Sequence, residues 1–249
     1  MEENREKIEG EIKLKSPFLT KLENFWYHYK WHSLVALFLV FVITISSVQM
    51  CSKTNYDIYI LYAGNHEIKH TTSKGSNPYL DMVASLKKVG EDFDEDGNVN
   101  VNLLNLYVLS EEEMQEALEG TESGAEINQS LVMEDTETLA TTLLYGEHYI
   151  CLLSERIFLE NEAKYDGLLF APIAEYTVAG EEYEYASERG IYLRSLDLYE
   201  LPELSNLPDD TVVCIRQLSE VSSFFGKRDN EEYFRRAEIV LKNILSYSN

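Results

Sequence analysis

Hydrophobic and polar positions divide the chain into one continuous apolar run and a longer part with alternating patterns. The run, residues 34–50, has no polar stripe of the kind that a helix on a protein surface carries. It lies within residues 31–52, which are 22 positions without a formal charge. A helix needs ~20 residues at ~1.5 Å each to cross ~30 Å of hydrocarbon. The run therefore predicts one transmembrane helix, residues 31–51.

The residues that flank the run predict its orientation. Its basic neighbours on the N-terminal side are Lys15, Lys21 and Lys30, whereas Lys53 is the one close basic residue on the other side. Aromatic residues at 25–32 suit the headgroup region of a bilayer. Because basic residues favour the cytoplasmic side, we expect residues 1–30 to form a cytoplasmic tail with an aromatic juxtamembrane segment. The C-terminal part is then extracytoplasmic.

A cleaved signal peptide and a buried helix of a soluble protein are the alternatives for this run. The 33 residues ahead of it are long for a signal peptide, and residues 46–50 lack an A-x-A-like cleavage site. Cys51 follows Met50, whereas a lipid-modified bacterial cysteine follows a small residue. An uncleaved signal anchor in the cell membrane, with a single span, is therefore the prediction.

Residues 52–249 alternate between strand and helix patterns. Strands are predicted at residues 56–64, 98–109, 148–153 and 211–215. Helices between them are predicted to begin at Asn77-Pro78, at the capping box Ser110 and Glu113, at Asp135 and at Ser154. Residues 121–133 are expected to be a surface loop. This order predicts one extracytoplasmic α/β domain with a mixed, largely parallel sheet flanked by helices.

The charge of the chain lies entirely in this domain. Residues 1–51 carry six Lys/Arg and six Asp/Glu, so the remaining 15 basic and 38 acidic residues give the domain the whole net charge of -23. Such an acidic surface repels phosphates and attracts cations and basic partners. Nucleic acid is therefore not an expected partner.

Three cysteines are too few for a disulfide framework. Cys151 and Cys214 each lie in an apolar strand pattern, where a cysteine is usually a small buried hydrophobic residue. A bridge between them is possible only if those two strands are neighbours.

An acidic stretch after the helix that begins at Asn77 carries the most specific chemical pattern. Its candidate metal ligands are Asp92, Asp94, Asp96, Asn98 and Asn100. Alternate carboxylates can converge on one hard cation, Gly97 allows a sharp turn, and Asn98 can offer its backbone carbonyl. The stretch resembles the first nine positions of an EF-hand-type calcium loop. Calcium is the cofactor that this resemblance implies.

The stretch departs from that pattern at the twelfth position, Leu103, where an EF-hand has a bidentate glutamate. Glu91, Glu95 or a remote carboxylate would have to replace this ligand. The alternative is an acidic turn between helix and strand, because Asp, Asn and Gly are also turn residues. Calcium outside a cell is abundant enough to fill sites with a Kd of about 10⁻⁴ to 10⁻³ M.

Two further resemblances concern longer parts of the chain. Within residues 135–175, a strand and a short helix followed by Gly-Leu-Leu-Phe-Ala-Pro-Ile at 167–173 are similar to a region of type II extracellular solute-binding proteins. The aromatic entry, single span and acidic stretch together resemble uncharacterised single-pass membrane proteins of Firmicutes. The first resemblance implies ligand binding, and neither supplies known functional residues.

No nucleophile elbow, phosphate-binding glycine loop or dinucleotide fingerprint occurs. His66 and His70 are spaced to share a metal on a helix, although the residues after His70 favour a loop. The main hypothesis is a non-enzymatic binding or interaction module, anchored in the membrane and stabilised by calcium, beside a transport or envelope complex. The alternatives are a cell-envelope hydrolase whose site is not identified and a structural subunit of a membrane complex.

Overall fold

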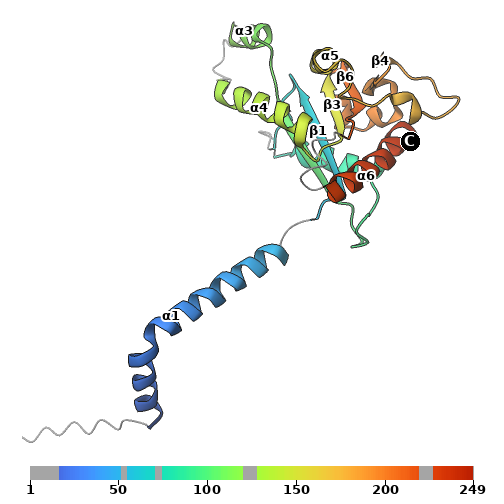
Figure 1. Cartoon of the computed structure of the whole chain (residues 1–249). Helices are drawn as coiled ribbons and strands as arrows, with labels where there is room; N and C mark the ends of the chain where they lie inside the picture. Colours follow the sequence, from blue (N-terminus) through green and yellow to red (C-terminus); the bar gives the residue numbers. More distant parts are fainter. Residues whose placement is uncertain (1–16, 52–54, 71–74, 120–127, 219–226, 249) are drawn as a thin grey trace, which may run out of the picture. The chain divides into compact units, whose positions relative to one another are not determined.

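The computed structural model describes residues 17–51, 55–70, 75–119, 128–218 and 227–248 (Figure 1). The chain forms two compact units, Met1–Thr54 and Asn55–Asn249. The first contains a single described helix, and the second contains all the described strands.

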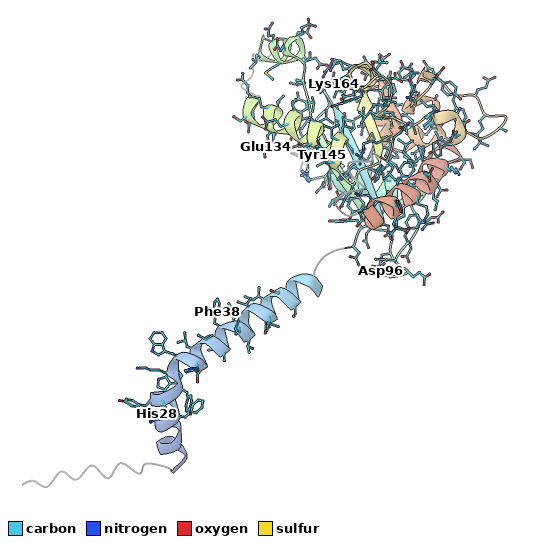
Figure 2. The ribbon with its side chains drawn as sticks, viewed as in Figure 1. His28, Phe38, Asp96, Glu134, Tyr145 and Lys164 are labelled. Carbon is cyan, nitrogen blue, oxygen red and sulfur yellow. The ribbon has the colours of Figure 1, made fainter. Side chains whose placement is uncertain are left out.

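Helix α1, Pro17–Cys51, is the first unit's described element. It contains the 23-residue apolar window Phe25–Ser47, with a mean hydropathy of 1.6 and no buried residue. Side chains such as Phe38 project freely from it (Figure 2). The hydroxyls of Thr44 and Ser47 donate to the carbonyls of the preceding turn, at 2.7 and 2.8 Å, so neither needs water. The predicted N-terminal apolar helix is confirmed, and it starts before residue 31.

The second unit is built on a six-stranded sheet in the order β2-β1-β3-β6-β5-β4. Its strands are β1 Ile58–Gly64, β2 Val101–Tyr107, β3 Ile150–Ser154, β4 Tyr185–Ser187, β5 Gly190–Tyr192 and β6 Thr211–Ile215. Strand β1 pairs in parallel with both β2 and β3. The pairs β3–β6, β6–β5 and β5–β4 are antiparallel.

The predicted α/β class and mixed sheet are confirmed, but the expectation of a largely parallel sheet is wrong. Parallel strands need a crossover connection, but the helix at residues 155–164 that follows β3 does not lead to a parallel neighbour of β3. The hairpin of β4 and β5 and the short turns at 193–206 come next, and they bring the chain back to start β6 beside the end of β3. The connections between the strands thus determine which half of the sheet is parallel and which is antiparallel.

Helices cover both faces of the sheet. They are α2 Pro78–Leu86, α3 Glu111–Glu119, α4 Gln129–Tyr145, α5 Glu155–Lys164 and α6 Lys227–Leu245. Short 3-10 helices lie at Lys87–Val89, Ile173–Glu175, Leu193–Ser195, Asp197–Glu200 and Leu204–Asn206.

Alternation along β1 illustrates how the two layers of the core form. Ile58, Ile60 and Tyr62 belong to one buried cluster with residues of α2 and α6, whereas Leu61 and Ala63 belong to another with residues of α4 and α5. Because successive strand side chains point to opposite faces, a strand buried on both sides is apolar throughout. The predicted interior position of this strand is therefore confirmed.

Two of the predicted helix starts are confirmed by their hydrogen bonds. The Asn77 side chain accepts the N–H of Leu80 at 3.1 Å at the start of α2. Ser110 and Glu113 form the predicted capping box, each side chain accepting the other residue's N–H, at 2.7 and 3.0 Å. Both starts are set by local sequence alone.

The predicted start of α4 at Asp135 is wrong. The helix begins at Gln129, and the side chain of Asn128 accepts the N–H of Leu131 as its cap. Residues 129–133 therefore belong to this helix and not to a loop, while residues 121–127 of the predicted loop lie outside the described residues. Asp135 instead accepts the N–H of Tyr107 at 2.8 Å. This hydrogen bond satisfies a backbone donor of edge strand β2 that has no neighbouring strand to pair with.

Arg216, at the end of β6, joins the sheet to the end of α4. Its side chain is 1 % exposed and stacks on the Tyr149 ring, 4.4 Å from the ring centroid. It donates to the carbonyls of Leu143 (3.2 Å) and Gly146, so it binds carbonyls at the end of the helix that have no partner within the helix. Burial lowers the pKa of Arg216.

We expect Arg216→Ala to lower the free energy of unfolding by about 2–4 kcal/mol, because it leaves two helix-end carbonyls without their donor and opens space beside Tyr149. Urea unfolding of residues 55–249 measures this change. Arg235→Ala is the control, since Arg235 is an exposed arginine paired with Glu232 on α6. Equal stability of the two variants would contradict the role of Arg216.

His148 precedes β3 and stacks edge-on against Tyr59, 5.5 Å between ring centroids. Burial, with the charge of Arg216, lowers the pKa of His148 from 6.5 to about 4. The unfolded chain therefore binds a proton more readily between these values, so stability that is present above pH 6.5 is lost as the pH falls toward 4.

We expect His148→Gln to remove this part of the acid sensitivity, which amounts to about 3 kcal/mol in full. Urea unfolding at pH 7 and pH 4.5 compares the variant with the unmodified protein. His70→Gln, at an exposed histidine, should keep the original pH dependence. If all three proteins lost equal stability on acidification, the assignment to His148 would be incorrect.

Candidate metal centre and ligand pocket

A buried carboxylate holds the acidic loop against the sheet. Asp57, directly before β1, is 1 % exposed. One of its oxygens accepts the N–H of Phe93 and the other the N–H of Asn100, both at 2.8 Å. The backbone N–H of Asp57 in turn donates to the Asn100 carbonyl at 2.8 Å. Asp57 therefore fixes both ends of the loop and the register of β2 beside β1.

Between these ends, the loop aspartates accept the loop's own N–H groups. Asp92 accepts from Asp96 (3.1 Å) and Gly97 (2.8 Å), Asp94 accepts from Asp96 (3.2 Å), and Asp96 accepts from Asn98 (2.7 Å). Gly97 has φ +88°, a backbone conformation that favours glycine. The sharp turn predicted at Gly97 is therefore present.

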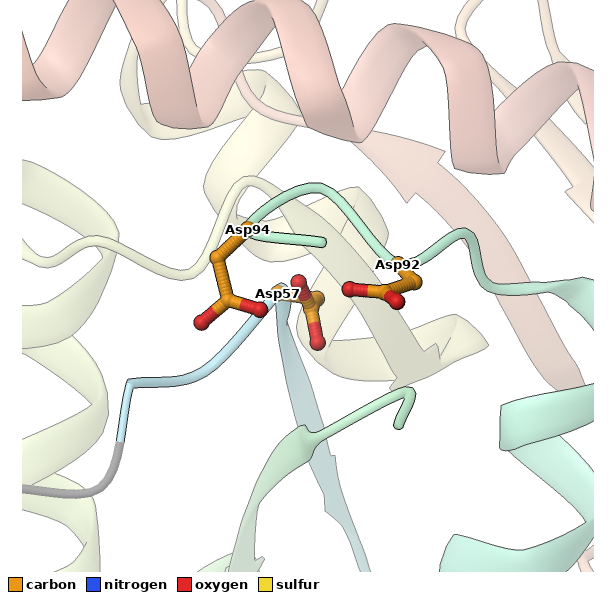
Figure 3. A group of neighbouring side chains, drawn as sticks. All are labelled: Asp57, Asp92 and Asp94. Atoms are coloured by element: carbon orange, nitrogen blue, oxygen red, sulfur yellow. The ribbon is translucent and has the colours of Figure 1, made fainter. Parts of the chain in front are cut away.

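The structure brings together two of the predicted metal ligands and one carboxylate that sequence interpretation missed. Among the described residues, one oxygen each of Asp57, Asp92 and Asp94 lie within 4.8 Å of one another. Asp57 lies at the start of β1 with the other two on either side of it (Figure 3). Asp57 is buried, Asp92 is half-buried and Asp94 is exposed.

The remaining predicted ligands lie elsewhere on the loop. Asp96 is exposed and is not part of this three-carboxylate group. Asn98 is also exposed, and the side chain of Asn100 donates to Asp96 at 3.4 Å. Leu103 is buried in the core, so position twelve offers no ligand. Asp57 is the remote carboxylate nearest to that role.

The mutual repulsion of the carboxylates favours a positive charge at this group. Desolvation raises the pKa of the Asp94 carboxyl, and the negative charges of Asp96 and Asp57 raise it further. Helix α6 packs beside the loop, with the Arg236 guanidinium 5.2 Å from the Phe93 ring centroid. Several carboxylate oxygens gathered on a turn are the ligands that calcium and magnesium take in proteins. The ligand set alone does not select calcium, so calcium stays a prediction.

A separate pocket of about 330 Å³ lies at the opposite, carboxyl end of β1. Its lining comes from the loop after β1, from α2 and from residues 203–207: His66, Glu67, Ile68, Lys69, Pro78, Met82, Glu203, Asn206 and Leu207. Ile68, Met82 and Leu207 are buried and form an apolar floor, while Glu67 and Lys69 are exposed at its rim. The pocket therefore combines an apolar floor with a charged rim, as small-molecule sites in proteins commonly do.

Sequence interpretation missed this pocket, because its lining comes from segments more than a hundred residues apart. In the sequence, only His66 and the polar loop around it indicated this region. No helix forms at 65–70, in agreement with the predicted loop. His70 stacks on Tyr79, 4.3 Å between ring centroids, while His66 lines the pocket.

No protein-family model, curated protein or solved structure matches the chain. The resemblances to solute-binding proteins and to Firmicutes membrane proteins therefore stay predictions, and function has to be argued from the residues.

We expect Asp57→Asn to lower the free energy of unfolding by about 1–3 kcal/mol. An asparagine has a single acceptor oxygen, so one of the two loop N–H groups that Asp57 accepts would face the NH₂ group of the amide and lose its hydrogen bond. Urea unfolding of residues 55–249 checks this loss. The control is Asp94→Asn, at the exposed member of the group, which should have little effect. A stable Asp57→Asn protein would show that Asp57 does not hold the loop.

Proposed function

We propose that the protein is a single-pass membrane protein whose second unit, residues 55–249, is an extracytoplasmic binding and interaction module without catalytic activity. The observation that carries this proposal is the apolar window Phe25–Ser47, in which no residue is buried.

Exposure of this window supports the membrane assignment. Among the described residues, large side chains along α1 are exposed, and Leu37 is 70 % exposed. Exposing so much contiguous apolar surface is unfavourable in water and favourable in hydrocarbon. The helix's own carbonyls accept the hydroxyls of Thr44 and Ser47, so these two hydroxyls stay paired in hydrocarbon.

Charge supports the orientation and the class of partner. Lys15, Lys21 and Lys30 precede the uncharged stretch 31–52, Lys53 is the one close basic residue after it, and the whole net charge of -23 lies in residues 52–249. A basic flank favours the cytoplasm, and an acidic domain favours cations and basic protein surfaces. A transport or envelope complex with a basic docking surface is the kind of partner that fits.

Sheet topology supports ligand binding at the carboxyl end of β1. The chain leaves β1 for β2 on one side and returns to β3 on the other. In α/β sheets, ligands bind outside the carboxyl ends of strands at such a reversal of strand order. The pocket lined by His66, Glu67 and Lys69 lies at this end. Its apolar floor and mixed charges favour a small amphipathic ligand.

The three-carboxylate group has a supporting role in this proposal. With Asp57 binding both ends of the loop, a cation held by Asp92 and Asp94 would fasten helix α2 and strand β2 to the start of β1. Calcium is the cation expected outside a cell, where a weak site can fill.

We expect 10 mM calcium to stabilise the full chain in detergent by about 1–3 kcal/mol, for a Kd of about 10⁻⁴ to 10⁻³ M. Thermal unfolding with and without calcium, together with calorimetric titration, measures this. The double variant Asp92→Asn, Asp94→Asn should lose the response, and Asp81→Asn, at an exposed aspartate on α2, should keep it. Absence of calcium-dependent heat and of any rise in Tm would exclude the calcium role.

The membrane assignment is tested by carbonate extraction of membranes from cells that express the full chain with a tag at each end. We expect both tags to remain in the membrane pellet on one uncleaved chain. Recovery of a shortened, soluble chain without the N-terminal tag would identify a signal peptide instead.

A matched pair of variants makes this test specific for α1. Leu37 in the window and Leu168 in the second unit are 70 % and 73 % exposed. Leu37→Asp places a charge in the proposed span, at a cost of about 2.5–3.5 kcal/mol, and should reduce the membrane-bound fraction. Leu168→Asp should leave it unchanged.

A further inference from the structure

Two cysteines face each other across the junction between the parallel and antiparallel halves of the sheet. Cys151 of β3 and Cys214 of β6 are direct partners in the antiparallel pair, so their side chains lie on the same face. Both are completely buried in the cluster beneath α4 and α5. Both are free thiols in the structure.

The thiols are close enough to interact. The Cys214 Sγ lies 3.8 Å from the Cys151 carbonyl oxygen. Burial raises the pKa of the Cys214 thiol, and the adjacent Cys151 thiol raises it further. The pair therefore has a geometry and an environment that one cysteine among apolar side chains would not have.

Strand geometry brings the pair within the range of a disulfide. The N–H of Arg216 donates to Tyr149 at 2.8 Å, and two residues further along each strand lie Cys151 and Cys214. They thus form a hydrogen-bonded pair, in which Cα atoms are about 5.5 Å apart. Disulfides span Cα distances of about 4.4–6.8 Å, with Cβ atoms about 3.5–4.5 Å apart. The Cβ atoms of a hydrogen-bonded pair are about 5.5 Å apart, so forming the disulfide requires a local change of strand twist that brings them at least about 1 Å closer.

We propose that Cys151 and Cys214 form a disulfide that joins β3 to β6 when the domain folds on the oxidising side of the membrane. The inference rests on the extracytoplasmic orientation proposed above. Its structural consequence is to fasten the antiparallel half of the sheet to the parallel half, across 63 residues of chain.

The reaction is a thiol–disulfide exchange with the disulfide of an oxidoreductase or of a small-molecule thiol. One cysteine thiolate attacks that disulfide and forms a mixed disulfide, and the second thiolate then displaces the carrier's sulfur. The two cysteines lose two protons and two electrons, and the carrier is reduced to two thiols. Because both thiols are buried in the folded domain, the exchange takes place before β6 docks on β3.

Counting thiols in the full chain tests the proposal. Membranes are quenched with acid, denatured and treated with a polyethylene glycol maleimide that shifts the chain on a gel once per free thiol. We expect one shift, from Cys51, and three shifts after reduction. Three shifts without reduction, in a chain whose second unit is accessible from outside the cell, would overturn the disulfide.

Refolding of the purified chain shows whether the two cysteines can form a disulfide, independently of which side of the membrane the domain occupies in cells. The purified full chain is refolded in detergent in a glutathione redox buffer, and its thiols are counted again. One shift supports the disulfide even if the domain proves to be cytoplasmic in cells. Three shifts after refolding overturn it irrespective of location.

Stability provides a second readout that does not depend on labelling. Reduction should lower the Tm of the oxidised chain by roughly 5–10 °C, because it releases a long closed loop. The double variant Cys151→Ala, Cys214→Ala should not respond to reductant, whereas Cys51→Ala should respond as the unmodified chain does. An equal response of both variants would contradict the proposal.

Discussion

Helix α1 imposes the constraint on which the rest of the account depends. No residue of its apolar window is buried in the described part of the chain, and water is an unfavourable surrounding for a continuous apolar surface. A bilayer removes this penalty, since the helix satisfies its own backbone groups. The proposed anchoring determines which cations, partners and redox conditions the α/β unit meets. The proposed roles of the acidic loop and of the cysteine pair both rest on an extracytoplasmic location.

Within the α/β unit, buried side chains hold two strand pairs together: β1 with β2, and β3 with β6. Asp57 ties the acidic loop to the start of β1 and thereby sets β2 beside it. At the other junction, β6 pairs with β3, where Cys151 meets Cys214 and Arg216 reaches the end of α4. The first junction holds a parallel pair and the second begins the antiparallel half. Both pairs contain buried polar or sulfur-containing side chains, which help to define a register that uniformly apolar strands specify weakly.

Local signals in the sequence were sufficient for much of this fold. Asn77 and the pair Ser110 and Glu113 start helices as predicted, because a cap needs residues only three positions apart. Gly97 likewise marks its turn. The direction of β6 was not predictable, since an apolar strand pattern has no polarity. The start of α4 was misplaced because Asp135 looks like a helix cap, whereas its carboxylate serves edge strand β2.

The candidate sites were predictable only where their residues are neighbours in the chain. Asp92 and Asp94 stood out by their spacing, but Asp57 lies about 35 residues earlier and joins them only in the fold. The pocket beside β1 combines His66 with Glu203 in the same way. Orientation is the claim that connects these sites to function. Protease treatment of intact spheroplasts that carry a chain tagged at each end tests it most directly. We expect the C-terminal tag to be digested while the N-terminal tag is protected. Protection of the C-terminal tag until the cells are lysed would exclude the extracytoplasmic orientation.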